Sequence, residues 1–449
     1  MRRYIPFLIA GLILLESCAE VSVRETQNFV QVKGIHFSLS GKPYYFGGTN
    51  FWYGAYLGSP GKTGDRNRLK RELDNLIELG ITNLRVCAAS EESLMGRSIR
   101  PAFQKAPGVY DEELLEGLDY LLAEMGKRNM KAVLFLNNYW QWTGGMAQYN
   151  AWFNKENVPD PDDPAVGYGK FMDYSAEFYL NDKAMEGFRT YIKILITRKN
   201  KFTGLFYADD PAIMAWQLAN EPRPGRDLSI IKTADVFYKW VDETAKLIHS
   251  LDPNHLVTTG TEGLAGSLQS DEIFMKEHRS KYIDYATMHL WPKNWGWFNA
   301  NKADETYPRT EKNAIAYINK HLVMARELNK PITMEEFGIP RDEEKYKPGT
   351  GTKARDNYFR KIFELIYDSA AAGAPIGGTN FWGWGGTGRN TNDDSMWREG
   401  DPYLGDPAQE PQGLNSIYDT DLSTLEIIKI HSEKIAKLRC KDFMVNSRK

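Results

Sequence analysis

The chain has 449 residues, with 56 Lys and Arg against 59 Asp and Glu, so its formal net charge is −3 at pH 7. This near balance argues against nucleic acid or an acidic surface as a partner, and 42% hydrophobic residues suffice for a large core. The 12 Trp, 24 Tyr and 21 Phe indicate either a large core or a cleft that stacks planar ligands.

The N-terminal segment, residues 1–18, has the pattern of an export signal. Arg2 and Arg3 precede an apolar run from Tyr4 to Leu15 that is too short to span a bilayer. The run ends in Leu15-Glu16-Ser17-Cys18, which is similar to a lipoprotein box that lipidates the cysteine, although Glu16 is unusual there. We predict export to the periplasm, outer membrane or cell surface with Cys18 as lipid anchor; ordinary cleavage nearby is the alternative.

Residues 19–35 are predicted to form a tether, and residues 36–449 a single folded domain. A hairpin signal, with Gly41 and Pro43 in its turn, covers residues 37–46. Short β-rich runs then alternate with longer amphipathic segments. The predicted strands are 45–50, 82–87, 132–137, 213–218, 256–260, 285–289, 332–336 and 376–381. The predicted helices are 66–79, 112–128, 184–198, 234–251, 311–328, 354–372 and 425–438.

Eight strands alternating with helices predict an α/β fold, a closed (β/α)8 TIM barrel, with an open doubly wound sheet as the alternative. The chain exceeds the usual barrel length in two long loops, 138–182 after the third strand and 383–423 after the eighth. Both loops follow strands, so they are expected on the C-terminal face, where barrels keep their sites.

The predicted strand ends are unusually rich in polar and aromatic residues. Convergent carboxylates, donors and stacking rings are typical of glycosidic bond cleavage, in which one carboxylic acid protonates the leaving oxygen and a carboxylate attacks the anomeric carbon. The residues are Asn50, Trp52, Arg85, Asn137, Asn138, Trp140, Asn220, Glu221, His289, Trp291, Glu335, Glu336 and Trp382.

Other chemistries have little support. The seven His show no helical i, i+4 metal pair, and Gly61-Lys62-Thr63 lacks the first glycine of a phosphate loop because position 56 is Tyr. There is no GxSxG elbow and no CxxC pair, so Cys87 and Cys440 are predicted to be free thiols. We therefore predict a site without metal or cofactor.

The motifs resemble those of the β-mannanases of glycoside hydrolase family 5, subfamily 7, over residues 33–438. The Asn-Glu-Pro run at 220–222 resembles the wider clan of barrel glycosidases, and the run from Asn137 to Trp152 resembles the mannanases within it. The segments 331–338 and 378–382 add further matches.

The resemblance implies that Glu221 is the acid/base and Glu336 the nucleophile. Glu335 is the rival for the second role, since adjacent strand residues point to opposite sides; the family places the nucleophile directly before an aromatic-Gly pair, which selects Glu336. Glu335 is then expected to be a structural acid on the outer side. The charge of Glu336 is expected to raise the pKa of Glu221.

Further residues match substrate-binding positions of the family. Arg85 matches the Arg beneath the nucleophile, Asn220 the residue that bonds the sugar 2-hydroxyl, and His289 a residue near the reacting sugar, although a lone buried His is the alternative. Trp291 replaces a family Tyr, which leaves its role open. The predicted stacking residues are Trp382 at the cleavage point and Trp52 and Trp140 at neighbouring subsites; Trp384, Trp397 and Tyr403 stay unassigned.

The resemblance therefore implies a retaining endo-β-1,4-mannanase acting on mannan, glucomannan or galactomannan, with a β-mannan polysaccharide or oligosaccharide as its partner. One alternative keeps the frame and changes the sugar, giving a β-1,4-glucanase or glucomannanase. The other alternative is a non-catalytic glycan-binding lipoprotein, whose mark would be loss of a catalytic carboxylate.

Overall fold

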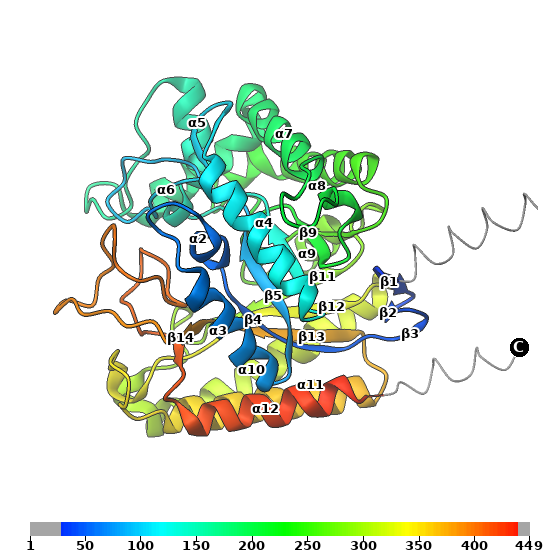
Figure 1. Cartoon of the computed structure of the whole chain (residues 1–449), viewed down its shortest axis with the longest axis vertical. Coiled ribbons are helices and arrows are strands. Elements are labelled where there is room, and N and C mark those ends of the chain that lie inside the picture. The colour runs from blue at the N-terminus through cyan, green and yellow to red at the C-terminus, as the bar shows by residue number, and fades with distance from the viewer. Residues whose placement is uncertain (1–27, 439–449) are drawn as a thin grey trace, which may run out of the picture.

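A computed structural model describes residues 28–438 of the chain. Eight parallel strands form one sheet in the order β10-β9-β8-β5-β4-β13-β12-β11, and a bridge between Thr258 and Tyr285 joins its two ends. The architecture is therefore a (β/α)8 barrel, as predicted (Figure 1). The strands are β4 (Phe46–Asn50), β5 (Ile81–Cys87), β8 (Lys131–Phe135), β9 (Ile213–Gln217), β10 (Leu256–Thr258), β11 (Ala286–Leu290), β12 (Ile332–Phe337) and β13 (Ile376–Phe381).

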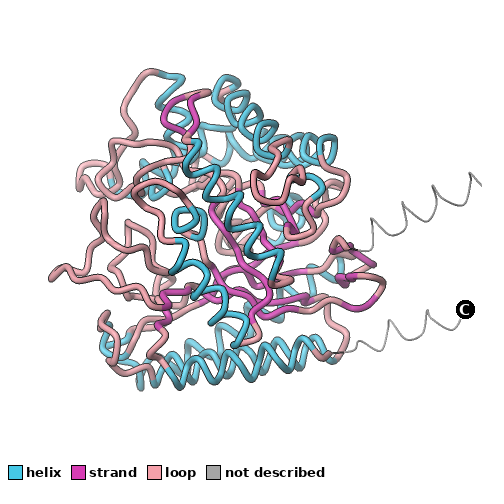
Figure 2. The backbone as a smooth tube through the Cα atoms, in the orientation of Figure 1, coloured by secondary structure: helices cyan, strands magenta, loops and turns pink. Residues whose placement is uncertain are grey.

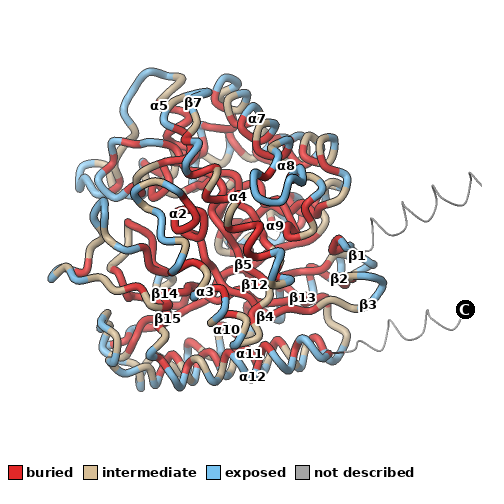
Figure 3. The backbone as a smooth tube through the Cα atoms, in the orientation of Figure 1, coloured by how far each residue is buried: buried red, intermediate tan, exposed pale blue. Residues whose placement is uncertain are grey.

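Helices surround this sheet on its outer side. Several begin at a side-chain cap: the Asp65, Asp111 and Asn181 side chains accept hydrogen bonds from backbone N–H groups in the first turns of α3, α4 and α7. The outer helices are α3 (Arg66–Glu78), α4 (Glu112–Lys127), α7 (Asp182–Ile196), α8 (Ile230–Leu251), α9 (Asp271–His278), α10 (Ala303–Glu327), α11 (Lys353–Ala371) and α12 (Leu422–Ala436). Their apolar faces pack on the strands, which are the most completely buried part of the chain (Figure 3).

The N-terminal hairpin closes the bottom of the barrel. Strands β1 (Val30–Lys33), β2 (His36–Leu39) and β3 (Lys42–Pro43) form an antiparallel sheet, and Val30 and Phe37 pack with residues from the strand starts, such as Met214. The predicted tether, 19–35, is therefore wrong over its last residues, because Val30–Lys33 pairs with β2 and buries an apolar side chain. The signal segment and Cys18 lie outside the described residues.

The loops gather on the opposite side of the barrel, at the carboxyl ends of the strands (Figure 2). The loop after β8 contains α5 (Gly145–Asn154) and α6 (Gly167–Ala176), and the loop after β13 contains β14 (Trp384–Gly386) and β15 (Ile417–Tyr418). A short helix, α2 (Gly54–Gly58), follows β4, and a small hairpin of β6 (Gln104–Ala106) and β7 (Val109–Tyr110) follows β5. Both long loops thus stand on the face where the sequence predicts the site.

Candidate active site

Most of the predicted site residues line one cavity at this C-terminal face. Its volume is about 640 Å³, within the range of small-ligand pockets. Its walls come from the ends of β8, β9, β10, β11, β12 and β13, and from both long loops. Among its lining residues are Trp140, Trp142, Asn220, Glu221, Arg223, Glu262, Trp291, Trp295, Glu336, Trp382, Gln409 and Glu410.

Arg85 holds Glu336 from beneath. The Arg85 side chain, from β5, is fully buried, and its Nη1 donates to Oε1 of Glu336 at the end of β12. Its other N–H groups donate to three amide oxygens: Gln217 Oε1 at 2.8 Å, Asn50 Oδ1 at 3.1 Å and Asn220 Oδ1 at 2.7 Å. Because each of its three nitrogens donates at least one hydrogen bond, the guanidinium is held in place against the Glu336 carboxylate.

His289 and Trp291, both from the end of β11, complete the surroundings of the two carboxylates. His289 Nδ1 lies 2.7 Å from Glu221 Oε1 and 3.3 Å from Glu336 Oε2. The Trp291 Nε1–H donates to Glu336 Oε2 at 3.1 Å, which supplies a donor where the family commonly has a Tyr hydroxyl. One oxygen of each carboxylate and a His289 nitrogen lie within 4.8 Å of one another. Glu221 also has a φ of 51°, a strained value for a non-glycine residue that is typical of functional sites.

The expected rise in the pKa of Glu221 is contradicted. Burial acts to raise this pKa, but the hydrogen bond and positive charge of His289, with help from Arg223 and a 2.5 Å bond from Trp140 Nε1, hold it below its usual value. Burial acts to lower the pKa of His289, but Glu336 and Glu221 raise it to about 9. The prediction from the sequence considered the charge of Glu336 but not the protonated His289 between the two acids. This cation reverses the expected direction of the Glu221 pKa shift.

The sequence predicted that Glu335 lies on the outer side of the barrel, but the structure places it inside. Gln217 Nε2 from β9 donates to its Oε2, Tyr285 and Thr333 donate hydroxyls to its Oε1 at 3.3 Å each, and Arg85 Nε lies 3.7 Å away. Burial raises the pKa of Glu335 despite the opposing charge of Arg85. Glu335 thus belongs to the barrel interior, among groups that satisfy it, and does not line the cavity.

A β-bulge explains why two adjacent acids both turn inward. Met288 of β11 pairs with Met334 of β12, but the next residue, His289, pairs with Glu336. Glu335 is therefore the extra residue on β12, and strict alternation of side chains fails at a bulge. Alternation was the reason for assigning Glu335 to the outside.

The predicted stacking residues divide into two groups. Trp382 and Trp140 line the cavity; Trp382 meets Trp291 edge-on at 5.9 Å between ring centroids, and its Nε1 is buried without a hydrogen-bond partner. Trp52 is a correction, because it is 1% exposed and packs against Trp142, which lies between it and the cavity. Trp384 donates to Glu72 of α3, Trp397 stacks on Tyr403, and none of Trp384, Trp397 and Tyr403 lines this cavity.

The cluster of Glu221, His289 and Glu336 offers three groups of the kind that bind metal ions. However, both carboxylates already receive N–H bonds from their neighbours, and Arg85 and protonated His289 supply positive charge beside them. These hydrogen bonds and positive charges therefore account for the closeness of the two carboxylates.

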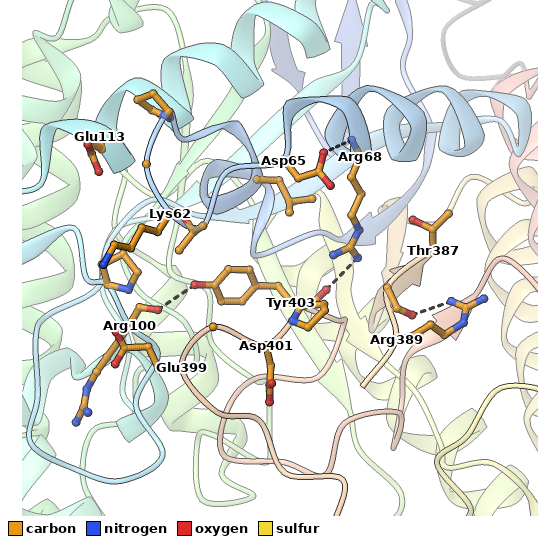
Figure 4. A pocket seen from close by; sticks show the side chains of 18 of the residues that line it. Lys62, Asp65, Arg68, Arg100, Glu113, Thr387, Arg389, Glu399, Asp401 and Tyr403 are labelled. Carbon is orange, nitrogen blue, oxygen red and sulfur yellow. Dashed lines mark hydrogen bonds between the residues drawn. The ribbon is translucent and has the colours of Figure 1, made fainter. Parts of the chain in front are cut away.

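A second, larger cavity of about 1390 Å³ lies between the start of α3 and the loop after β13 (Figure 4). Two of its arginines have partners within the fold. Arg68 donates to the Tyr403 carbonyl at 2.9 Å and to Glu72 at 3.1 Å, and Arg389 bonds Asp419. Tyr403 also lines this cavity, and its hydroxyl donates to the Arg100 carbonyl at 2.9 Å. None of the predicted catalytic residues lines it.

Comparison with known proteins agrees with this geometry. A sequence model described as "GH family 5 beta-mannosidase-like" matches residues 27–440. The chain belongs to glycoside hydrolase family 5. Mannan endo-1,4-beta-mannosidase 4 of Solanum lycopersicum is 30% identical over 420 residues, covering 92% of each protein. A crystal structure of a family 5 mannosidase from Rhizomucor miehei is 36% identical, with a TM-score of 0.84, covering 92% of this chain and 98% of that one.

The mutant form of that Rhizomucor miehei mannosidase is also similar, and its structure is a complex with mannosyl-fructose. The similarity to it has a TM-score of 0.83 at 36% identity, over 92% of this chain and 98% of that one. Together with the curated relatives, these similarities make this family 5 chain a glycoside hydrolase of the mannan-degrading kind, with a carbohydrate as its substrate.

Several residues of this family 5 site escaped the sequence analysis. Arg223 follows the Asn-Glu-Pro run directly, and its guanidinium pairs with Glu262 and lies 5.0 Å from the Trp140 ring. Position next to a motif was a usable signal for Arg223. Glu262 stands two residues after the predicted strand 256–260, so the end of that strand was a usable signal for it, whereas Glu410 stands in an irregular loop. Burial, opposed by Arg223, raises the pKa of Glu262 to about 7.

Proposed function

We propose that the protein hydrolyses β-1,4-mannosidic bonds by double displacement with net retention, with Glu336 as nucleophile and Glu221 as acid/base. One observation carries the mechanism: the two carboxylates face one cavity with oxygens within 4.8 Å. Retaining enzymes hold their carboxyl groups about 5 Å apart, whereas inverting enzymes need about 6.5 to 9.5 Å to admit a water.

The surrounding groups have roles in this chemistry that follow from their contacts. Arg85 and Trp291 keep Glu336 oriented for attack on the anomeric carbon. His289 and Trp140 orient Glu221 toward the leaving oxygen. The Trp382 ring offers the surface on which the reacting sugar stacks, and its free Nε1–H is a donor for that sugar.

Mannan is the proposed substrate because the relatives carry mannan-degrading names. Hydrolysis of purified mannan and cellulose derivatives side by side tests this, and equal rates would favour the glucanase alternative. Proton NMR of the first-formed anomer tests retention: a β-anomer supports it and an α-anomer contradicts it. The non-catalytic alternative conflicts with the presence of both carboxylates.

Two modes of action remain candidates. Endo action is the prediction from the sequence, and it agrees with the printed names of the curated relatives. Action at a chain end is the second candidate, since the 36% identical structure is named a mannosidase. The product profile from a long mannan separates them: endo cleavage gives mixed oligosaccharides early, and chain-end cleavage releases one short product throughout.

Export and lipid anchoring at Cys18 remain proposals that rest on the N-terminal motif alone. In a cell fractionation experiment the wild-type protein should then be found with the membranes.

A further inference from the structure

The loop from Asp406 to Ser416, which we call the cap loop, adds a further carboxylate to the catalytic cavity, besides those of Glu221, Glu262 and Glu336. Glu410 stands at its tip and lines the same cavity as Glu221 and Glu336. Its Oε2 atom is buried and has no hydrogen-bond partner among the described residues, and the same is true of Oε1 of the adjacent Gln409. Two unsatisfied acceptors beside the reacting groups are costly unless a ligand supplies donors.

The cap loop is held rigidly, so Glu410 is not a mobile surface group. The Asp406 carboxylate accepts from the backbone N–H of Gly413 and Asn415 at 2.8 Å each, and from Ser416 N at 3.1 Å. The Gln412 side chain donates to the carbonyls of Asp406 and Pro407 at 3.0 Å and of Glu410 at 3.2 Å. A carboxylate on such a fixed frame is suited to recognising a ligand in one position.

The cap loop also contacts loops that follow other strands of the barrel. Arg97, from the segment after β5, donates to the Gln409 carbonyl at 3.2 Å and pairs with Asp162 of the loop after β8 at 2.9 Å. Each contact is exposed and weak by itself. Together they link the loops after β5, β8 and β13 at the cap loop, on the loop-rich face of Figure 2.

We propose that Glu410 binds free hydroxyl groups of a terminal sugar beside Glu336, so that the enzyme acts at a chain end. This inference rests on the proposed hydrolysis of β-1,4-mannosidic bonds and favours the second mode of action. The 4-oxygen of an internal sugar is an ether that can only accept, whereas the 4-hydroxyl of the terminal sugar both donates and accepts and can therefore pair with Glu410 in either protonation state.

Electrostatics agree with this placement. Burial raises the pKa of Glu410 to about 8, Asp406, Glu336 and Glu221 add to the rise, and Lys293 opposes it. Glu410 is therefore within electrostatic reach of both catalytic carboxylates. No cation among the described residues forms an ion pair with it, so a neutral hydroxyl ligand meets no competing partner.

The test compares mannotetraose with the same oligomer methylated at its terminal 4-hydroxyl, for the wild type and for Glu410→Ala. We expect capping to lower the wild-type kcat/KM at least about 10-fold. Glu410→Ala should lower kcat/KM on the free oligomer about 10- to 100-fold, and should bring the ratio between the two substrates close to one. Glu410→Gln keeps the size of the side chain and an acceptor oxygen, so its kcat/KM should fall less. This comparison separates a loss of recognition from a collapse of the cap loop.

Glu399→Ala is the matched control, an exposed acid on the same long loop that does not line the catalytic cavity. It should leave both rates unchanged. Equal wild-type rates on capped and free oligomers would overturn the inference while leaving mannan hydrolysis intact. An unchanged ratio in a folded Glu410→Ala variant would also overturn it. Activity on another glycan with none on any mannan oligomer would overturn the proposed function, and this inference with it.

Discussion

Replacing each of the adjacent acids Glu335 and Glu336 by Ala should have opposite effects on folding and catalysis. In Glu335→Ala the donors on Gln217 and Tyr285 lose a buried partner. A buried polar group left unpaired costs about 1 to 3 kcal/mol, so two of them predict about 2 to 6 kcal/mol less unfolding free energy. In Glu336→Ala the Arg85 cation keeps its three amide partners, and because Glu336 lines the cavity, water can reach the donors of Arg85 and Trp291 that lose it, so the unfolding free energy should fall less than in Glu335→Ala.

Activity should follow the reverse order. Glu336→Ala should lose turnover on every substrate and, given azide, form a glycosyl azide of inverted configuration relative to the substrate, because azide replaces the missing nucleophile. Urea denaturation followed by circular dichroism gives the stabilities, and NMR identifies the azide adduct. Glu335→Gln is the control, since it keeps the volume and one acceptor. Azide rescue of Glu335→Ala with wild-type stability would refute the assignment of Glu336.

Five further outcomes can be checked. Glu221→Ala should keep glycosylation by substrates with good leaving groups, which need little protonation, as burst kinetics on aryl mannosides would reveal. Trp291→Phe removes the N–H donor to the nucleophile and should lower kcat about 10-fold without changing the melting temperature, measured by calorimetry. Asn220→Ala should lower kcat more than it raises KM. For the wild type, kcat/KM on mannan oligomers should exceed kcat/KM on cello-oligomers by about two orders of magnitude. The pKa of His289 in the folded protein, about 9, exceeds its ordinary value of 6.5. Its ionic contacts therefore stabilise the fold fully below pH 6.5, and this stabilisation is lost as the pH rises to 9. His289→Gln should lack that decline in stability when denaturation is measured as a function of pH.

The barrel was predictable because its strands and helices carry local signals. Each predicted strand overlaps an observed one, and the polar strand ends led to Glu221 and Glu336 because parallel strands deliver their last residues to one face. Trp52 shows the limit of this reasoning. It stands at a strand end as Trp382 does, but Trp142 from the loop after β8 covers it. Covering by a distant loop leaves no mark in the local sequence.

The functional groups that were missed share one physical property: irregular loops position them. Glu410 depends on the bonds of Asp406 to residues up to ten positions away, and Arg97 reaches its partners across the barrel mouth. No periodicity encodes such contacts. Glu335 differs, because a bulge seen only in the pairing of β11 with β12 turns it inward. Register irregularity is a property of two strands together, so one strand's pattern could not predict it.

The structure departs most from the expected chemistry in the protonation state of Glu221. In the free site both oxygens of Glu221 accept N–H bonds, from His289 and Trp140, and this favours the charged carboxylate. In the proposed mechanism, we expect the proton that acid catalysis needs to come from His289, whose Nδ1 lies 2.7 Å from Glu221 Oε1. A sugar on Trp382 would displace water, and in a drier cavity a charged pair is less favourable than a neutral pair in which Glu221 holds the proton. We therefore expect Glu221 to be protonated only when substrate fills the cavity.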